Sequence, residues 1–74
     1  MRGEQRVRSQ NSLREDDVIY FVSERRIHEY VLLRRDKDND RIQVRPLNVP
    51  RQRRGVWILN ARYWMKRGCI RRWP

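Results

Sequence analysis

Apolar residues gather in short runs along the chain, and the first of them predicts a strand. Residues 18–22 read Val-Ile-Tyr-Phe-Val. Such β-branched and aromatic residues lose rotamer freedom in a helix and pack well on a pleated sheet. We therefore predict a strand over residues 18–23, covered on both faces because its apolar side chains point both ways. Just before it, Ser12 and Glu15 have capping-box spacing, which predicts at most one helical turn.

The second apolar stretch, residues 27–35, fits neither a helix nor a strand by periodicity alone. It precedes the sequence Asp-Lys-Asp-Asn-Asp, which favours a turn because Asp and Asn bond their own backbone and tolerate left-handed conformations. Residues 41–45 then alternate strictly, with Ile42 and Val44 on one side. The pattern predicts a β-hairpin over residues 27–45 with these two side chains buried. The residues on the other side are predicted to be exposed: Arg41, Gln43 and Arg45.

The last third of the chain predicts a short helix. Pro46 and Pro50 end the sheet, and residues 56–59 fit either a last strand or the start of a helix. Asn60 is a suitable N-cap and Gly68 a suitable residue just past a helix end, so residues 61–67 should be helical.

These elements predict the fold class and the domain limits. Residues 1–12 are polar and without periodicity, which is typical of a disordered arm. We predict an α+β fold, a small antiparallel β-hairpin or meander with a short C-terminal helix. The single domain should span residues 13–68, followed by a basic tail over residues 69–74.

Length and composition exclude several classes of protein. A chain of 74 residues forms one small domain with a marginal core. Its longest nearly uncharged apolar stretch, Val18–Val22, is far shorter than the ~20 residues of a membrane span. Cys69 is the single cysteine, which excludes a disulfide framework, and with His28 it cannot supply four zinc ligands. The turn at residues 36–40 lacks the Gly and Glu that a calcium loop requires. We expect no metal and no cofactor.

No catalytic motif is present in the sequence. It contains no P-loop, no dinucleotide-binding Gly-rich loop and no nucleophile elbow, and nothing pairs His28 with Cys69 as a catalytic couple. We therefore predict that the protein is not an enzyme. The absence of a secretory signal, together with the single thiol, predicts a cytoplasmic location.

Charge is the strongest signal in the sequence, with a net value of +10. Residues 1–40 hold nine basic residues and all nine acidic ones, whereas residues 41–74 hold ten basic residues and no acid. Such asymmetry favours a polyanionic partner over a merely solvated basic surface. Seventeen of the nineteen bases are Arg, which suits phosphate and base stacking but is equally typical of a GC-rich genome.

Aromatic residues are interleaved with these bases, which favours RNA or DNA in single-stranded form. Trp57 is predicted to lie in the core, whereas the terminal Trp73 is predicted to contact a partner. The candidate nucleic-acid-binding residues are Arg51, Arg53, Arg54, Arg62, Lys66, Arg67, Arg71, Arg72 and Trp73.

Apolar side chains on both faces of two strands imply a second layer in so small a domain. Either the C-terminal segment or a protein partner, including a second copy, should cover them. The candidate protein-contact residues are Ile19, Phe21, Tyr30 and Leu32.

Several features together suggest a family: small size, a neutral and β-rich front, an acid-free, Arg- and Trp-rich back, and the lack of a catalytic motif. The similarity is centred on Asp17–Arg45 and Arg51–Trp73. The chain resembles the small phage-encoded regulators of host bacterial RNA polymerase, of the inhibitor and antiterminator type found in a Xanthomonas phage. The resemblance implies a domain that docks on a polymerase subunit in the host cytoplasm, with the basic segment near the nucleic-acid channel. A ribosomal or other ribonucleoprotein component is the alternative. Membrane-surface binding is disfavoured because Gly68 and Pro74 interrupt the basic tail.

Overall fold

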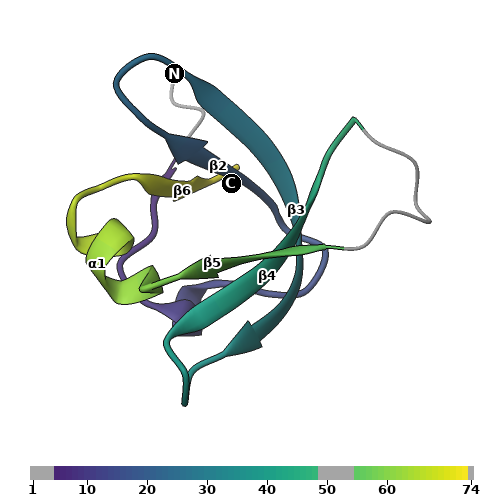
Figure 1. Cartoon of the computed structure of the whole chain (residues 1–74), viewed down its shortest axis with the longest axis vertical. Helices are drawn as coiled ribbons and strands as arrows, with labels where there is room; N and C mark the ends of the chain where they lie inside the picture. Colours follow the sequence, from purple (N-terminus) through teal and green to yellow (C-terminus); the bar gives the residue numbers. More distant parts are fainter. Residues whose placement is uncertain (1–4, 49–54, 74) are drawn as a thin grey trace.

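An antiparallel sheet, seen in Figure 1, forms the body of the computed structural model, which describes residues 5–48 and 55–73. Six strands lie in the order β1-β6-β2-β3-β4-β5, and every neighbouring pair is antiparallel. The strands are β1 (Gln5–Arg6), β2 (Val18–Val22), β3 (Ile27–Asp36), β4 (Arg41–Pro46), β5 (Val56–Leu59) and β6 (Ile70–Arg72). A 3₁₀ turn, η1 (Gln10–Ser12), follows β1, and the helix α1 (Ala61–Lys66) joins β5 to β6.

The predicted meander is confirmed. Strand β2 matches the strand predicted over residues 18–23, β3 and β4 form the predicted hairpin, and residues 56–59 form a strand. The short C-terminal helix is present as well. Strands carry nearly all of the regular structure, however, so a β-sheet with one short helix describes the fold better than α+β.

A β-bulge explains why residues 27–35 gave no clear period. The register of β3 against β4 shifts between Leu32 and Arg34. Leu32 therefore faces the core, and beyond the bulge Arg35 takes the inward position, where its Nη1 donates to the carbonyl oxygen of Gln10 at 3.0 Å. The extra residue reverses the alternation, so neither set of alternate positions could be wholly apolar.

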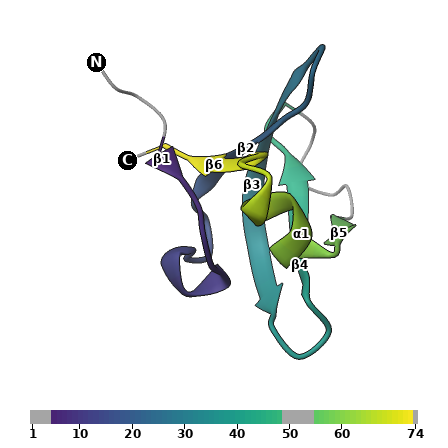
Figure 2. The ribbon, with the colours of Figure 1, turned by 90° about the vertical axis from the view of Figure 1, so that its left-hand side faces the viewer.

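The core lies on the inner face of the sheet. It is built from sheet residues such as Ile19, Leu32 and Ile70, and it is covered by the N-terminal segment and by α1, as Figure 2 shows from the side. Val7 and Leu13 supply the N-terminal part of that cover, and both are fully buried. The sheet thus uses both ends of the chain to close its core.

The predicted disordered arm is wrong for residues 5–12. Strand β1 pairs with β6, the Val7 N–H donates to the carbonyl oxygen of Ile70 at 3.0 Å, and Val7 enters the core. Two well-spaced apolar residues, Val7 and Leu13, suffice to anchor this polar segment because strand pairing satisfies its backbone. Residues 1–4 lie outside the described residues.

The predicted domain limits of 13 and 68 are wrong for the same reason. Strand β6 lies between β1 and β2, and Ile70 is completely buried. Residues 70–72 are therefore part of the sheet, and the domain extends at least from Gln5 to Trp73.

The predicted helical turn at Ser12–Glu15 does not form. The turn lies earlier, in η1, where the Ser9 hydroxyl caps it by accepting from the Asn11 N–H at 3.0 Å. The Asp17 carboxylate instead accepts from the Arg14 N–H at 2.9 Å, and Asp16 is left-handed with φ of 73°. A local side-chain bond thus competes successfully with the helix.

The side-chain orientation predicted for β4 is confirmed in part. Ile42 and Val44 are fully buried, whereas the three residues predicted to be exposed are half-buried. The Arg41 guanidinium binds the Asp36 carboxylate at 2.8 Å and lies 3.9 Å from the ring centroid of Trp57. Trp57 is therefore half-buried under an arginine rather than in the predicted core position.

The Asp36 ion pair gives the fold a predictable acid response. Hydrogen bonds from Arg41 and then from Asn39 lower the pKa of Asp36 below its ordinary value of 3.8. The stabilisation is therefore fully present above pH 3.8 and is lost as pH falls through the lowered pKa. We expect Asp36→Asn to reduce the drop in melting temperature between pH 5 and pH 2, measured by circular dichroism. Asp38→Asn, in the same turn, should leave that drop unchanged, and equal behaviour of the two variants would contradict the assignment.

Helix α1 begins and ends near the predicted residues but is capped differently. Asn60 is left-handed, with φ of 56°, and makes no side-chain cap bond. Asp40 replaces it, since its carboxylate accepts from the Arg62 N–H at 2.9 Å and its carbonyl from the Ala61 N–H. Gly68, with φ of 80°, follows the helix end as predicted.

Candidate nucleic-acid and protein interfaces

Four basic residues meet at a depression beside α1. We call them the cationic cluster: Arg6, Arg8, Arg62 and Lys66. Met65 is the remaining lining residue, so no carboxylate lines this depression within the described part of the chain. All four cluster residues are exposed. The arrangement produces a local positive field that is not neutralised from within the site.

Strand pairing and helical spacing both build the cluster. Arg6 Nη2 donates to the carbonyl oxygen of Lys66 at 2.6 Å, which ties β1 to the end of α1. Arg62 and Lys66 are four residues apart and share one face of the helix, where like charges repel by about 0.2–0.5 kcal/mol. An anion placed between the two side chains would relieve this repulsion.

The sequence predicted only half of the cluster. Arg62 and Lys66 belong to the acid-free half, but Arg6 and Arg8 lie in the neutral half and were not selected. Their position depends on the pairing of β1 with β6, two short strands that are more than sixty residues apart. No local sequence pattern predicts such a pairing.

An aromatic pair lies across the sheet from Arg6: Tyr20 is on β2, and Trp73 directly follows β6. Arg71 is the cross-strand partner of both Arg6 and Tyr20. The Trp73 ring packs edge-on against Tyr20, with ring centroids 6.2 Å apart, and Trp73 is 53% exposed. Trp73, which is predicted to contact a partner, therefore has an exposed ring packed on Tyr20, one strand beyond the Arg6–Arg71 pair.

The other predicted nucleic-acid-binding residues do not share this surface. Arg72 is half-buried with its Nε 3.8 Å from the Asp17 carboxylate, which offsets its charge. Arg67 lies over the ring of Tyr63, 5.7 Å from its centroid. Interaction with Tyr63 is the main cause that raises the pKa of Arg67, so this side chain stays charged. The predicted residues that lie outside the described part of the chain are Arg51, Arg53 and Arg54.

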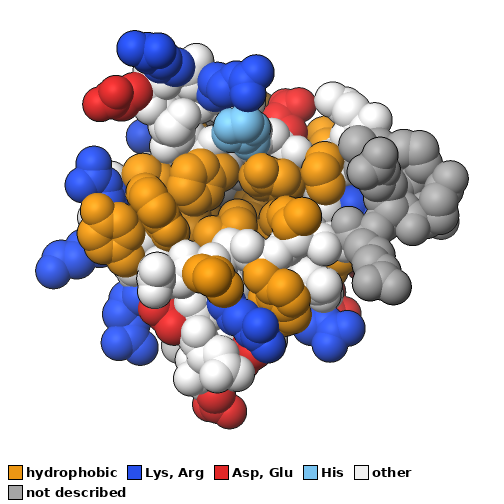
Figure 3. Space-filling model, viewed as in Figure 1, with side chains coloured by type: hydrophobic (Ala, Val, Ile, Leu, Met, Phe, Trp, Pro, Cys, Tyr) orange, Lys and Arg blue, Asp and Glu red, His pale blue; other side chains and the backbone are white. Residues whose placement is uncertain are grey.

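A second surface is apolar, and Figure 3 shows it as a band of hydrophobic side chains across one face. We call it the apolar groove, and its lining residues are Phe21, His28, Tyr30, Val56, Trp57, Ile58, Leu59, Asn60 and Trp64. Phe21 meets Trp64 edge-on at 5.3 Å between ring centroids, and His28 stacks on Tyr30 at 6.2 Å. Strand β5 forms one wall, and β4 is its single partner among the described strands.

Two of the predicted protein-contact residues are wrong. Ile19 and Leu32 are fully buried beneath the N-terminal segment and α1, so neither can touch a partner. Phe21 and Tyr30 occupy the same face of the sheet but line the groove, where they are half-buried. Strand alternation identified the correct face, but it could not show which part of that face the rest of the chain covers.

No protein-family model, curated protein or solved structure matches this chain. Within the described residues, no helix combines the length and the apolar character that a membrane span requires. Among the residues that the structure describes, the cationic cluster gathers basic side chains and the apolar groove gathers aromatic and aliphatic ones.

Proposed function

We propose that this protein is a non-enzymatic binding protein that holds the phosphate backbone of a nucleic acid on the cationic cluster. The observation that carries the proposal is the meeting of Arg6 and Arg8 with Arg62 and Lys66 in a depression without a lining carboxylate. Arg suits this role because its planar fork binds phosphate oxygens in two places. Released counterions would supply most of the binding free energy.

The aromatic residues beside the cluster favour a single strand. Bases of a single strand can stack on exposed rings, which is worth about 1–3 kcal/mol per base. Trp73, packed on Tyr20, offers such a ring at the edge of the basic surface. A duplex would leave this ring without a base face to contact.

Fluorescence anisotropy with an end-labelled single-stranded dodecamer tests the proposal. If each of the four cluster residues contacts one phosphate, the logarithm of affinity should fall with the logarithm of salt at a slope of roughly −2.8, about −0.7 per contact. Binding weaker than about 10⁻⁴ M at physiological salt, with both single and double strands, would contradict the proposal.

The apolar groove favours a second candidate function, docking on a protein partner. Val56, at 50% exposure, and Leu59, at 58%, line the groove together with its aromatic side chains, and a contiguous exposed apolar patch is typical of a protein-binding surface. The resemblance to phage regulators names a bacterial RNA polymerase subunit as the partner, and we propose docking through this groove. The basic surface would then lie near the nucleic acid that the polymerase holds.

A pull-down from bacterial lysate with nuclease present tests this docking. We expect polymerase subunits to be retained, and Leu59→Asp to reduce their capture by roughly 30-fold, the effect of a 2 kcal/mol hot spot. Ile27→Asp is the matched control, because Ile27 is 60% exposed and does not line the groove. Loss of all partners with nuclease would contradict docking and favour the ribonucleoprotein alternative.

A further inference from the structure

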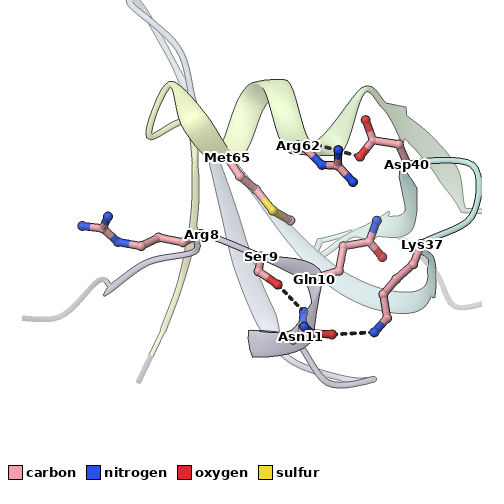
Figure 4. Close-up of a pocket in the computed structure, with 8 residues that line it drawn as sticks. All are labelled: Arg8, Ser9, Gln10, Asn11, Lys37, Asp40, Arg62 and Met65. Atoms are coloured by element: carbon pink, nitrogen blue, oxygen red, sulfur yellow. Dashed lines mark hydrogen bonds between the residues drawn. The ribbon is translucent and has the colours of Figure 1, made fainter.

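A cavity of about 290 Å³ lies between α1 and the turn that joins β3 to β4, as Figure 4 shows. This volume is just below the range of roughly 300–1,000 Å³ for small-ligand sites, so only a small group can enter. In Figure 4 the Gln10 amide points into the space between Arg62 and Asp40 on one side and Lys37 on the other, with Met65 beside it. The lining combines a thioether, an amide, a carboxylate and basic groups.

Gln10 is the unusual member of this lining. It is only 8% exposed, and its Oε1 has no hydrogen-bond partner within the described structure. Its Nε2 donates to two backbone carbonyl oxygens, those of Asp36 at 3.5 Å and of Arg41 at 3.3 Å. These two acceptors fix the orientation of the amide, because turning it over would bring Oε1 against two carbonyl oxygens.

Buried acceptors are nearly always satisfied, so an orphaned one inside a cavity indicates a missing donor. None of the hydrogen bonds in the cavity lining reaches this atom within the described structure: Lys37 Nζ donates to the Asn11 Oδ1, and the backbone N–H of Arg62 donates to Asp40. A ligand that fills the cavity should therefore bring an N–H group of its own to Gln10 Oε1.

The place of the cavity indicates the class of ligand. Its lining shares Arg8, Arg62 and Met65 with the depression that holds the cationic cluster, so the two depressions adjoin each other. A strand whose phosphates lie on the cluster would pass the mouth of the cavity. Unpaired bases in such strands are read by hydrogen bonds to their edges and by packing on their faces. Met65 lines the cavity at 2% exposure, and its flexible thioether side chain can shift to meet a ring.

We propose that this cavity receives one unpaired nucleobase that carries an amino group, as cytosine, adenine and guanine do. The amino group donates to Gln10 Oε1, the ring packs on Met65, and the phosphate of the same nucleotide lies near Arg62. Uracil and thymine present a carbonyl oxygen at the corresponding position and leave Gln10 unsatisfied. This inference rests on the proposed nucleic-acid binding and adds base selectivity to it.

Cytidine and uridine monophosphates are matched probes, because the rings differ at C4, where one carries an amino group and the other a carbonyl. We expect cytidine monophosphate to shift the side-chain amide NMR signal of Gln10 in the wild-type protein in a saturable manner. Uridine monophosphate should leave the signal in place. Equal shifts with both nucleotides, or none with either, would overturn the inference and leave the cavity to water.

Oligonucleotides separate this inference from the proposed function. In the anisotropy assay, oligocytidine should bind about tenfold more tightly than oligouridine to the wild type. Gln10→Leu should remove the difference while oligouridine binding is unchanged. If both oligomers bind equally to the wild type with a steep salt dependence, base selectivity is wrong but phosphate binding stands. If neither binds, the proposed function itself fails.

Discussion

Val44→Asp is expected to unfold the protein at room temperature. Val44 is completely buried, between its cross-strand partners Leu32 and Val56. An unpaired carboxylate at this position would lose its hydration without gaining a partner, which costs several kcal/mol. The free energy of unfolding of the whole domain should be roughly 4–11 kcal/mol, at about 0.05–0.15 kcal/mol per residue. The substitution should therefore remove most or all of the free energy of unfolding.

Val56→Asp is the matched control for this experiment. Val56 lies opposite Val44 on β5 but is half exposed, so a carboxylate there keeps much of its water. Thermal melting by circular dichroism should show a cooperative transition for the control and none for Val44→Asp. A Val44→Asp protein that melts at the temperature of the parent would show that the facing of β4 is wrong.

Local signals explain why the central meander could be predicted. Residues 41–45 alternate without exception, and the turn before them contains three Asp and one Asn, so that hairpin is determined within about twenty residues. The signals for β2 and for the end of the helix are equally local. They are the β-branched run of residues 18–22 and the glycine at position 68. These elements are correct in the structure.

Long-range pairing explains what the sequence did not reveal. Strands β1 and β6 are two and three residues long, and each is stabilised by its neighbours rather than by its own composition. The N-terminal segment contains one apolar residue before Leu13 that reaches the core, Val7, which is too few to distinguish it from a disordered arm. The polar composition of this segment favours disorder, but the pairing of β1 with β6 orders it.

The candidate site divides in the same way. The acid-free block pointed to Arg62 and Lys66, because charge patterning needs no knowledge of the fold. Arg8 and Gln10 carried no signal, because each gains its role only when the N-terminal segment folds against α1 and the β3–β4 turn. The sequence therefore predicts that the C-terminal half is basic, but not which surface its basic residues form with the N-terminal segment.

Replacing Arg62 and Lys66 together by Gln should weaken single-strand binding by roughly 25-fold at 0.1 M salt. The double variant removes two of the four proposed phosphate contacts. At about −0.7 per contact, the salt dependence should become shallower by roughly 1.4. Both side chains are exposed, so the fold should survive, and the far-ultraviolet circular dichroism spectrum checks that it does.

The control replaces Arg26 and Arg34 by Gln, which removes the same charge elsewhere. Both residues are exposed, and neither lines the cluster, the groove or the cavity. Long-range electrostatics alone would weaken binding by both double variants equally. Site-specific contacts require the slope to change for the Arg62 and Lys66 variant and to stay near that of the parent for the control.

The most direct test of nucleic-acid binding by the cationic cluster is a backbone amide NMR titration of the wild-type protein with single-stranded oligouridine. We expect the largest chemical-shift changes on residues 5–8 and 61–66, where the segment that begins with β1 and the helix α1 bring the cationic cluster together. The amide signals of β5 and of the turn between β2 and β3 should keep their chemical shifts. Shifts confined to the apolar groove, or an unchanged spectrum at millimolar oligonucleotide, would contradict nucleic-acid binding by the cluster.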